Sequence, residues 1–205
     1  MLLIQVLYMS RILSFPNFGR MKVYDLNDRV DMMGIRNDLK TLSCEKHSRI
    51  IETRRKVIHF QYQKPNTFIR STNHTRYPEY FPSDVIQFSR LLQIYSKIED
   101  IPDNGNISIE AQRITCEPGS NNSIDFDIWN KNMASKAGIF CINKCNVQGG
   151  VLEFCNEDKI NVSVTLRPGH IVIFDSNSIQ HRVTHINSKN GKASGYHDVM
   201  LFSCP

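Results

Sequence analysis

Residues 137–202 carry the feature that most limits how this chain can fold. Short apolar runs there alternate with turns rich in Gly, Pro and Asn at steps of about ten residues, which is typical of a β-sandwich or barrel. Over residues 160–166 every second side chain is apolar, which predicts a strand with one buried face. Residues 171–174 are all apolar and predict a more deeply buried strand. The C-terminal half should therefore be a β structure around an apolar interior.

The whole pattern predicts a mainly β protein with a helical cover on its N-terminal side. A helix is expected after Ser83, which can cap it, because apolar residues follow at helical spacing as far as Ile98. Residues 45–58 suggest a helix turning into a strand, and residues 61–82 an irregular segment lying across a sheet. Strands are predicted near residues 107–116, 124–129, 137–142, 151–155, 160–166, 170–175, 180–186 and 196–203. Eight strands with helices on one side match a double-stranded β-helix, or jelly roll.

Length and composition favour a single globular domain. A chain of 205 residues with 40% hydrophobic residues can bury a core of its own. We expect residues 1–20 to be a leader or a first strand. Residues 21–205 should form one domain, with the cover over 21–104 and the jelly roll over 105–205. No segment is long and apolar enough to span a bilayer. The six cysteines are too few for a disulfide framework, which favours a reducing, intracellular setting.

Four motifs in the C-terminal half resemble those of the iron- and 2-oxoglutarate-dependent dioxygenases. The resemblance is strongest to a small family that includes bacterial free-amino-acid hydroxylases and relatives in protist mobile elements and large DNA viruses. It covers residues 107–203 and implies the jelly-roll fold, Fe(II) and 2-oxoglutarate. The motifs are Asn143 to Gly150 (family pattern N-R-x-N-v-x-G-G), Leu166 to Gly169 leading to Phe174 and Asp175, His181 to Thr184, and Gly195 to Val199.

The same resemblance implies where the site would be. Counting back from Asn143 without gaps, the His-x-Asp iron motif of the family falls on Asn130 and Asn132, so both ligands would be Asn. His181 matches the second iron histidine, and His197 takes the place of the Arg that grips the far carboxylate of 2-oxoglutarate. None of the seven histidines has Asp or Glu two positions later, so the chain holds no other motif of this kind.

These replacements predict that the chemistry has been lost. Amide oxygens are poor substitutes for an imidazole and a carboxylate on iron, and a neutral imidazole offers one donor where Arg offers a charged fork. Alone on a strand that faces a barrel interior, His181 is more often a core residue than a metal ligand. We therefore predict a catalytically degenerate dioxygenase-like protein that acts as a binding or structural module, with protein partners or in a larger assembly. No cofactor is expected.

Two alternatives remain open. One is an active Fe(II)/2-oxoglutarate-dependent hydroxylase of an amino acid or a protein side chain, with His181 among non-standard metal ligands. The other is a nucleic-acid-binding module, because the chain has a net charge of +5 and interleaves cations with aromatic residues after residue 45. Its candidate cations are Lys46, Arg49, Arg54, Arg55, Lys56, Lys64, Arg70 and Arg76.

Overall fold

A large antiparallel sheet forms the centre of the protein. The structure is a computed structural model that describes residues 12–19, 21–41, 45–47, 55–63, 67–70, 86–99, 106–118, 129–130 and 135–204. From one edge to the other the strands are β1 (Ile12–Ser14), β2 (Lys22–Asp25), β11 (His170–Asp175), β7 (Lys136–Cys145), β14 (Gly195–Cys204), β6 (Asn106–Cys116), β4 (Arg55–Gln63) and β3 (Glu45–His47), with β5 (Thr67–Arg70) also paired to β4.

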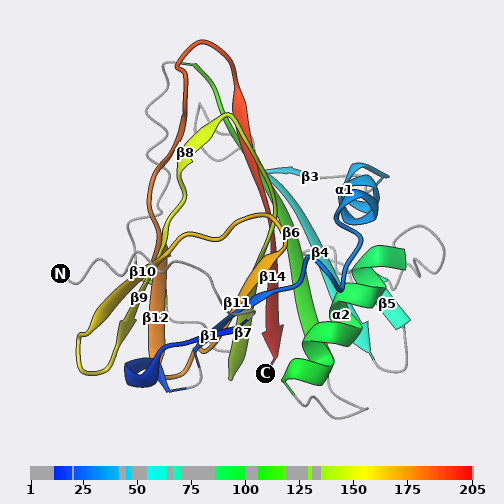
Figure 1. Ribbon diagram of the computed structural model, residues 1–205. Coiled ribbons are helices and arrows are strands. Elements are labelled where there is room, and N and C mark those ends of the chain that lie inside the picture. Colours follow the sequence, from blue (N-terminus) through cyan, green and yellow to red (C-terminus); the bar gives the residue numbers. More distant parts are fainter. Residues whose placement is uncertain are drawn as a thin grey trace.

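A smaller sheet faces the large one and closes the barrel. It consists of β10 (Asn161–Val164), β9 (Leu152–Asn156) and β12 (Ile179–Val183), and a two-stranded ribbon of β8 (Val147–Gly149) and β13 (Ile186–Ser188) lies at one end (Figure 1). Apolar side chains from both sheets form one buried cluster, which includes Val172 and Phe174 on β11 and Leu152 and Phe154 on β9. This is the jelly roll predicted from the sequence.

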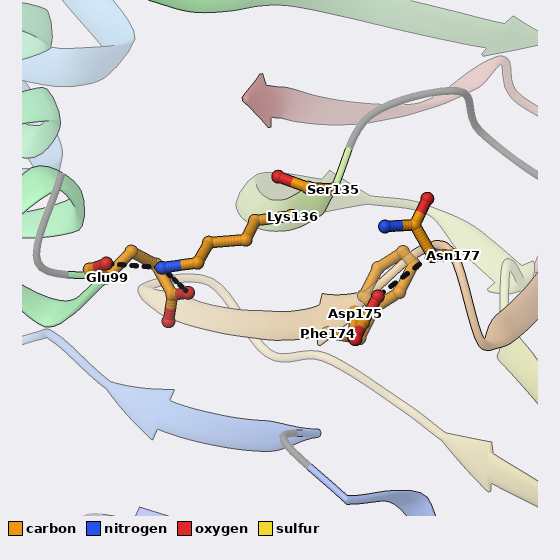
Figure 2. A pocket seen from close by; sticks show the side chains of 6 residues that line it. All are labelled: Glu99, Ser135, Lys136, Phe174, Asp175 and Asn177. Carbon is orange, nitrogen blue, oxygen red and sulfur yellow. Dashed lines mark hydrogen bonds and ion pairs between the residues drawn. The ribbon is translucent and has the colours of Figure 1, made fainter. Parts of the chain in front are cut away.

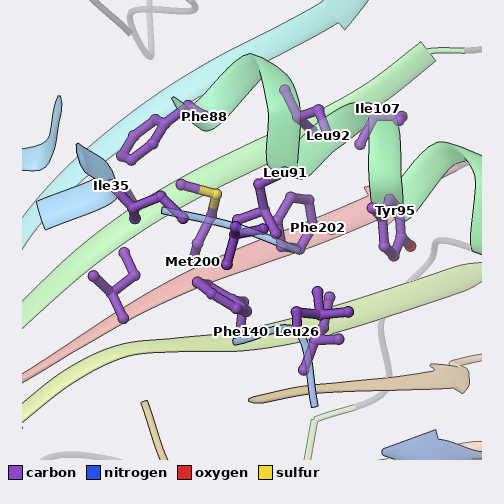
Figure 3. Packing of buried hydrophobic residues seen from close by; sticks show 14 of the residues in the cluster. Leu26, Ile35, Phe88, Leu91, Leu92, Tyr95, Ile107, Phe140, Met200 and Phe202 are labelled. Carbon is purple, nitrogen blue, oxygen red and sulfur yellow. The ribbon is translucent and has the colours of Figure 1, made fainter. Parts of the chain in front are cut away.

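Two helices cover the outer face of the large sheet, α1 (Met32–Thr41) and α2 (Ile86–Ile98). A short 3-10 helix, η1 (Pro16–Phe18), follows β1. Tyr95 of α2 stacks on Phe202 of β14 with ring centroids 4.7 Å apart, within the second core cluster (Figure 3). Gly138 permits this close approach, because a Cβ at that position would lie 2.9 Å from the Tyr95 ring. The helices thus brace the sheet from the side opposite to the barrel interior.

Most of the expected β elements are present. The predicted strands near 107–116, 137–142, 151–155, 160–166, 170–175 and 196–203 correspond to β6, β7, β9, β10, β11 and β14. The expected strand 180–186 is instead divided into β12 and β13, and residues 124–128 lie outside the described part of the chain. The helix expected after Ser83 is α2, which begins at Ile86.

The N-terminal half differs from the expectation in three places. Residues 21–43, which gave no predicted element, contain β2 and α1. The helix expected at the start of 45–58 is wrong, because residues 45–47 form β3. The irregular segment expected at 61–82 is wrong for residues 61–63 and 67–70, which belong to β4 and β5. The strand expected at the end of 45–58 is present as the start of β4, which pairs with its sequence neighbours β3 and β5 and with the distant β6.

Candidate functional site

The backbone of Asn130 pairs directly with that of His181. Asn130 N donates to His181 O at 2.8 Å, and His181 N donates to Asn130 O at 3.1 Å. Residues directly opposite each other in an antiparallel pair project to the same face. The Asn130 amide therefore lies on the same side as the His181 imidazole, at the edge of the small sheet next to β12.

A row of side chains on the outer face of the small sheet supports the pairing of Asn130 with His181. The Arg182 guanidinium lies 4.8 Å from the centroid of the Trp129 ring, and its Nε donates to Glu153 Oε2 at 2.6 Å. Trp129 precedes Asn130, and Arg182 follows His181. Side chains alternate between the two faces of a strand, so the contact of Trp129 with Arg182 on the outer face implies that Asn130 and His181 project to the inner face. Trp129 is the single tryptophan of the chain.

The His181 ring packs among aromatic rings of the barrel interior. Its centroid lies 5.1 Å from that of Phe174 and 6.3 Å from that of Phe154. Burial lowers the pKa of His181 to about 4, and its buried Nδ1 has no hydrogen-bond partner among the described residues. At neutral pH this imidazole is uncharged, as both a metal ligand and a core residue would be.

His197 is packed more tightly, on β14. It is 5% exposed, and its Nε2 lies 3.7 Å from Cys141 Sγ of β7. Its buried Nδ1 has no hydrogen-bond partner within the described part of the chain, and a Cβ on Gly150 would lie 3.1 Å from that atom. Burial, followed by the charge of Lys144, lowers the pKa of His197 to about 3. The ring is therefore neutral and cannot supply the charged fork that the resemblance assigns to this position.

Asp198, next to His197, has its own partner on the opposite face of the large sheet. Its side chain is fully buried, and Arg113 of β6 donates to both carboxylate oxygens at 2.7 and 2.8 Å. The Arg113 guanidinium also lies 4.5 Å from the centroid of the Tyr196 ring. This pair is a structural link between β6 and β14, and the carboxylate does not reach the barrel interior.

Two residues near His197 were not singled out from the sequence. Lys144 lies directly opposite His197 across the β14–β7 pair, and Cys141 contacts its ring. A β-bulge between Asp198 and Val199 shifts the register of this strand pair. Because the bulge is formed by a partner distant in sequence, local spacing cannot reveal these contacts.

The remaining predicted positions have different outcomes. Five of these positions lie outside the described residues: Asn132, Arg49, Arg54, Lys64 and Arg76. Four other cations lie on β3, β4 and β5, whose backbones alone are described: Lys46, Arg55, Lys56 and Arg70. Within the described ranges, no group of three His, Cys, Asp or Glu side chains could hold a metal ion. None of the described helices is long and apolar enough to cross a membrane.

A small open hollow of about 110 Å³ lies where α2 ends, β7 begins and β11 ends (Figure 2). It contains none of the four predicted site residues, although Phe174 on its wall also contacts the His181 ring. Lys136 Nζ in this hollow already pairs with Glu99 Oε2 at 3.4 Å. The hollow is lined by Glu99, Ser135, Lys136, Phe174, Asp175 and Asn177.

Comparisons with known proteins agree with the fold. A family model described as 2OG-Fe dioxygenase matches residues 36–203. No curated protein matches the sequence at a significant level.

Three similar crystal structures illustrate the likeness. The Fe(II)/α-ketoglutarate-dependent dioxygenase TqaL has a TM-score of 0.61 at 8% identity, covering 85% of this chain and 75% of that one. A bsmA homologue from Methylobium petroleophilum has a TM-score of 0.58 at 14% identity, covering 84% and 79%. An oxygenase-family protein from Caulobacter crescentus, described as putative, has a TM-score of 0.55 at 12% identity, covering 92% and 80%.

Proposed function

The chain belongs to the 2OG-Fe dioxygenase family, which depends on Fe(II) and 2-oxoglutarate, and we propose that this member has lost that catalysis and acts as a binding or structural module. The observation that carries the proposal is the pairing of Asn130 with His181. This pairing supports an arrangement in which an amide stands where the family has an imidazole, next to the histidine that matches the iron motif.

The donor set does not fit Fe(II). Iron in this kind of site is held by two imidazoles and one carboxylate, which provide nitrogen donors and negative charge. Asn130 and Asn132 offer neutral amide oxygens, which suit harder cations with many oxygen ligands. His181 would then be the single strong donor for iron. No catalytic step is assigned to these residues.

The residue at the family's 2-oxoglutarate position also cannot bind this cosubstrate as the family does. The family position for gripping the far carboxylate is occupied by a neutral ring packed against Cys141 and beside Gly150. An imidazole cannot form the two parallel, charged hydrogen bonds of a guanidinium. Both ends of the cosubstrate would therefore lack their usual partner, the metal at one end and the Arg at the other.

The scaffold supplies a reason to retain two of the four motifs, Asn143 to Gly150 and Leu166 to Gly169. Gly149 has a φ of +82°, and a Cβ there would collide with the carbonyl oxygen of His185. Asn146 has a φ of +49°, and its Nδ2 donates to Ala193 O at 2.7 Å. Gly169 has a φ of +87°, and a Cβ there would collide with the Asn27 side chain. These residues are needed to close turns of the barrel, so they are compatible with loss of chemistry.

A module of this kind would act through protein partners or within a larger assembly, in a reducing compartment. The described cysteines, which are Cys116, Cys141, Cys145, Cys155 and Cys204, form no disulfide bond with one another. Three of them are buried and serve as small apolar residues of the core.

The proposal is tested by measuring succinate formed from 2-oxoglutarate with and without Fe(II). We expect no Fe(II)-dependent succinate, and no difference between the unaltered protein and His181→Ala. Fe(II)-dependent succinate that His181→Ala abolishes would establish the alternative, an active hydroxylase with non-standard ligands.

A further inference from the structure

An exposed Asn-Gly pair lies in the loop that joins β13 to β14, at the end of the barrel that carries β8 (Figure 1). Asn190 and Gly191 are both exposed, so water reaches them. Gly191 has a φ of +62°, and no atom lies within 4 Å of the place where its Cβ would be. The backbone nitrogen of Gly191 is therefore open to approach from the side chain that precedes it.

The Asn190 side chain is folded back over this loop. Its Oδ1 accepts from the backbone N–H of Lys192 and from that of Ala193, at 3.1 Å in both cases. Both donors follow Gly191 in the chain, so the side-chain carbonyl of Asn190 lies along the Gly191 peptide, as in the turns that Asn commonly forms with its own backbone. The carbonyl carbon Cγ of Asn190 is thereby held next to the nitrogen of Gly191.

A third donor to the same oxygen comes from the connection between β7 and β8. Asn146 in that connection donates from Nδ2 to Asn190 Oδ1 at 3.1 Å. The same Nδ2 donates to Ala193 O at 2.7 Å, which holds the Asn146 amide beside the loop. Three N–H groups therefore surround Asn190 Oδ1, and such an arrangement stabilises negative charge on a carbonyl oxygen.

This geometry permits loss of the Asn190 amide without an enzyme. The nitrogen of Gly191 attacks Cγ of Asn190, its proton passes through water to Nδ2, and the Cγ–Nδ2 bond breaks to release ammonia. Water then opens the cyclic imide that has formed. Attack of water on Cγ restores the normal backbone and leaves aspartate, whereas attack on the backbone carbonyl of residue 190 leaves isoaspartate. Overall, water is consumed and ammonia is released, with no change of oxidation state.

The three donors distinguish the two products. They polarise the Cγ carbonyl, which favours attack of water at Cγ, and they form charge-assisted hydrogen bonds with the carboxylate of aspartate. Isoaspartate adds an atom to the backbone of the loop, which moves the side-chain oxygen away from these donors. We propose that Asn190 is a site of spontaneous deamidation, and that its contacts with Asn146, Lys192 and Ala193 direct the product to aspartate. The change adds a negative charge to a loop whose charged residues are Lys189 and Lys192.

The test compares folded protein at pH 8 and 37 °C with the same protein unfolded in urea. After proteolysis, the mass gain of deamidation is measured on peptides that contain residue 190, and electron-transfer fragmentation distinguishes aspartate from isoaspartate. We expect deamidation at Asn190 in both samples, with an aspartate-to-isoaspartate ratio at least about threefold higher in the folded protein. Asn104-Gly105, the other such pair in the chain, lies outside the described residues and is followed as a reference in urea.

Three variants examine the donors and the amide. Asn146→Gly removes the third donor and retains a residue that accepts the φ of +49° at this position, so its ratio in the folded protein should fall toward the value in urea. Lys192→Gln keeps the backbone N–H and is the matched control, and its ratio should equal that of the unaltered protein. Asn190→Gln should give no deamidation at this position over the same time, because the larger ring closes much more slowly.

The inference is overturned if Asn190 keeps its amide in the folded protein while the urea sample deamidates, or if both samples give the same product ratio. An unchanged ratio in folded Asn146→Gly would also overturn it, because the third donor would then have no part in the choice of product. If Asn146→Gly does not fold, the comparison of the folded with the unfolded unaltered protein decides the question. These measurements need neither Fe(II) nor 2-oxoglutarate, so their outcome is separate from that of the succinate assay.

Discussion

The backbones of Asn130 and His181 exchange two hydrogen bonds, at 2.8 and 3.1 Å, across the edge of the small sheet. The pair joins the sequence position expected for the first iron ligand to the position expected for the last one.

Restoring the family motif should restore metal binding. We expect Asn130→His combined with Asn132→Asp to strengthen Co(II) binding by about 100-fold, or about 2.7 kcal/mol, because it adds a nitrogen donor and a charge beside His181. Binding can be measured by the visible absorption of Co(II) and by quenching of Trp129 fluorescence. The same double substitution with His181→Ala should lose the gain. An unchanged affinity in the double variant would mean that residues 130–132 do not face His181.

Stability should fall as the pH falls below neutral. The pKa values of His181 and His197 are lowered from 6.5 to about 4 and about 3, so the unfolded state binds their protons first. The stabilisation is complete above pH 6.5 and is lost on acidification, until the pH reaches the folded pKa of each ring. At pH 5.5 each histidine should lower the free energy of unfolding by about 1.4 kcal/mol.

Urea denaturation at pH 7.5 and 5.5 measures this loss. His181→Leu should reduce the difference between the two pH values, because it removes one of the two buried rings. An identical pH dependence in the variant would show that the His181 ring is not kept neutral by burial.

Breaking the Arg113–Asp198 pair should be strongly destabilising. Arg113→Met leaves a fully buried carboxylate without its two donors, at an expected cost of about 3–5 kcal/mol. Arg113→Met combined with Asp198→Leu should recover much of this loss, because no buried charge remains. Chemical denaturation compares the variants. A single variant as stable as the original protein would contradict the assigned pairing.

The two glycines Gly149 and Gly191 should respond differently to alanine. Both have positive φ, +82° and +62°, but a Cβ on Gly149 would collide with the carbonyl oxygen of His185, whereas Gly191 has no atom within 4 Å. We expect Gly191→Ala to cost about 1–2 kcal/mol from its backbone conformation alone. Gly149→Ala should cost about 1–3 kcal/mol more, measured by thermal or urea unfolding. Equal costs would mean that β8 does not approach β13 this closely.

Much of the barrel was predictable because its strands have strong local signals. The alternating residues of β10 and the apolar run of β11 identify strands without any knowledge of their partners. By contrast, β3 and β4 mix charged with apolar residues without a clean alternation, so only a strand at the end of 45–58 was expected there. The helix α1 was missed although its signals are present: Asp31 Oδ1 accepts from the N–H groups of Met33 and Gly34, and apolar residues follow at helical spacing, as at Ile35 and Leu39.

The sequence indicated the candidate site positions themselves, but not the residues that pack around them. Motif spacing singled out residues 130, 181 and 197, and the structure pairs the first two by their backbones. The positions of Lys144 and Cys141 beside His197 depend on the bulge in the β14–β7 register. Contacts of this kind arise from three-dimensional packing and leave no local pattern.

The most direct test of the account is a crystal soaked with Fe(II) and 2-oxoglutarate, with anomalous diffraction recorded at the iron edge. We predict no iron peak at bonding distance from His181 and no diacid bridging from His181 to His197. An iron peak bound by His181, with 2-oxoglutarate beside it, would contradict the claim that the barrel has been kept while its chemistry was lost.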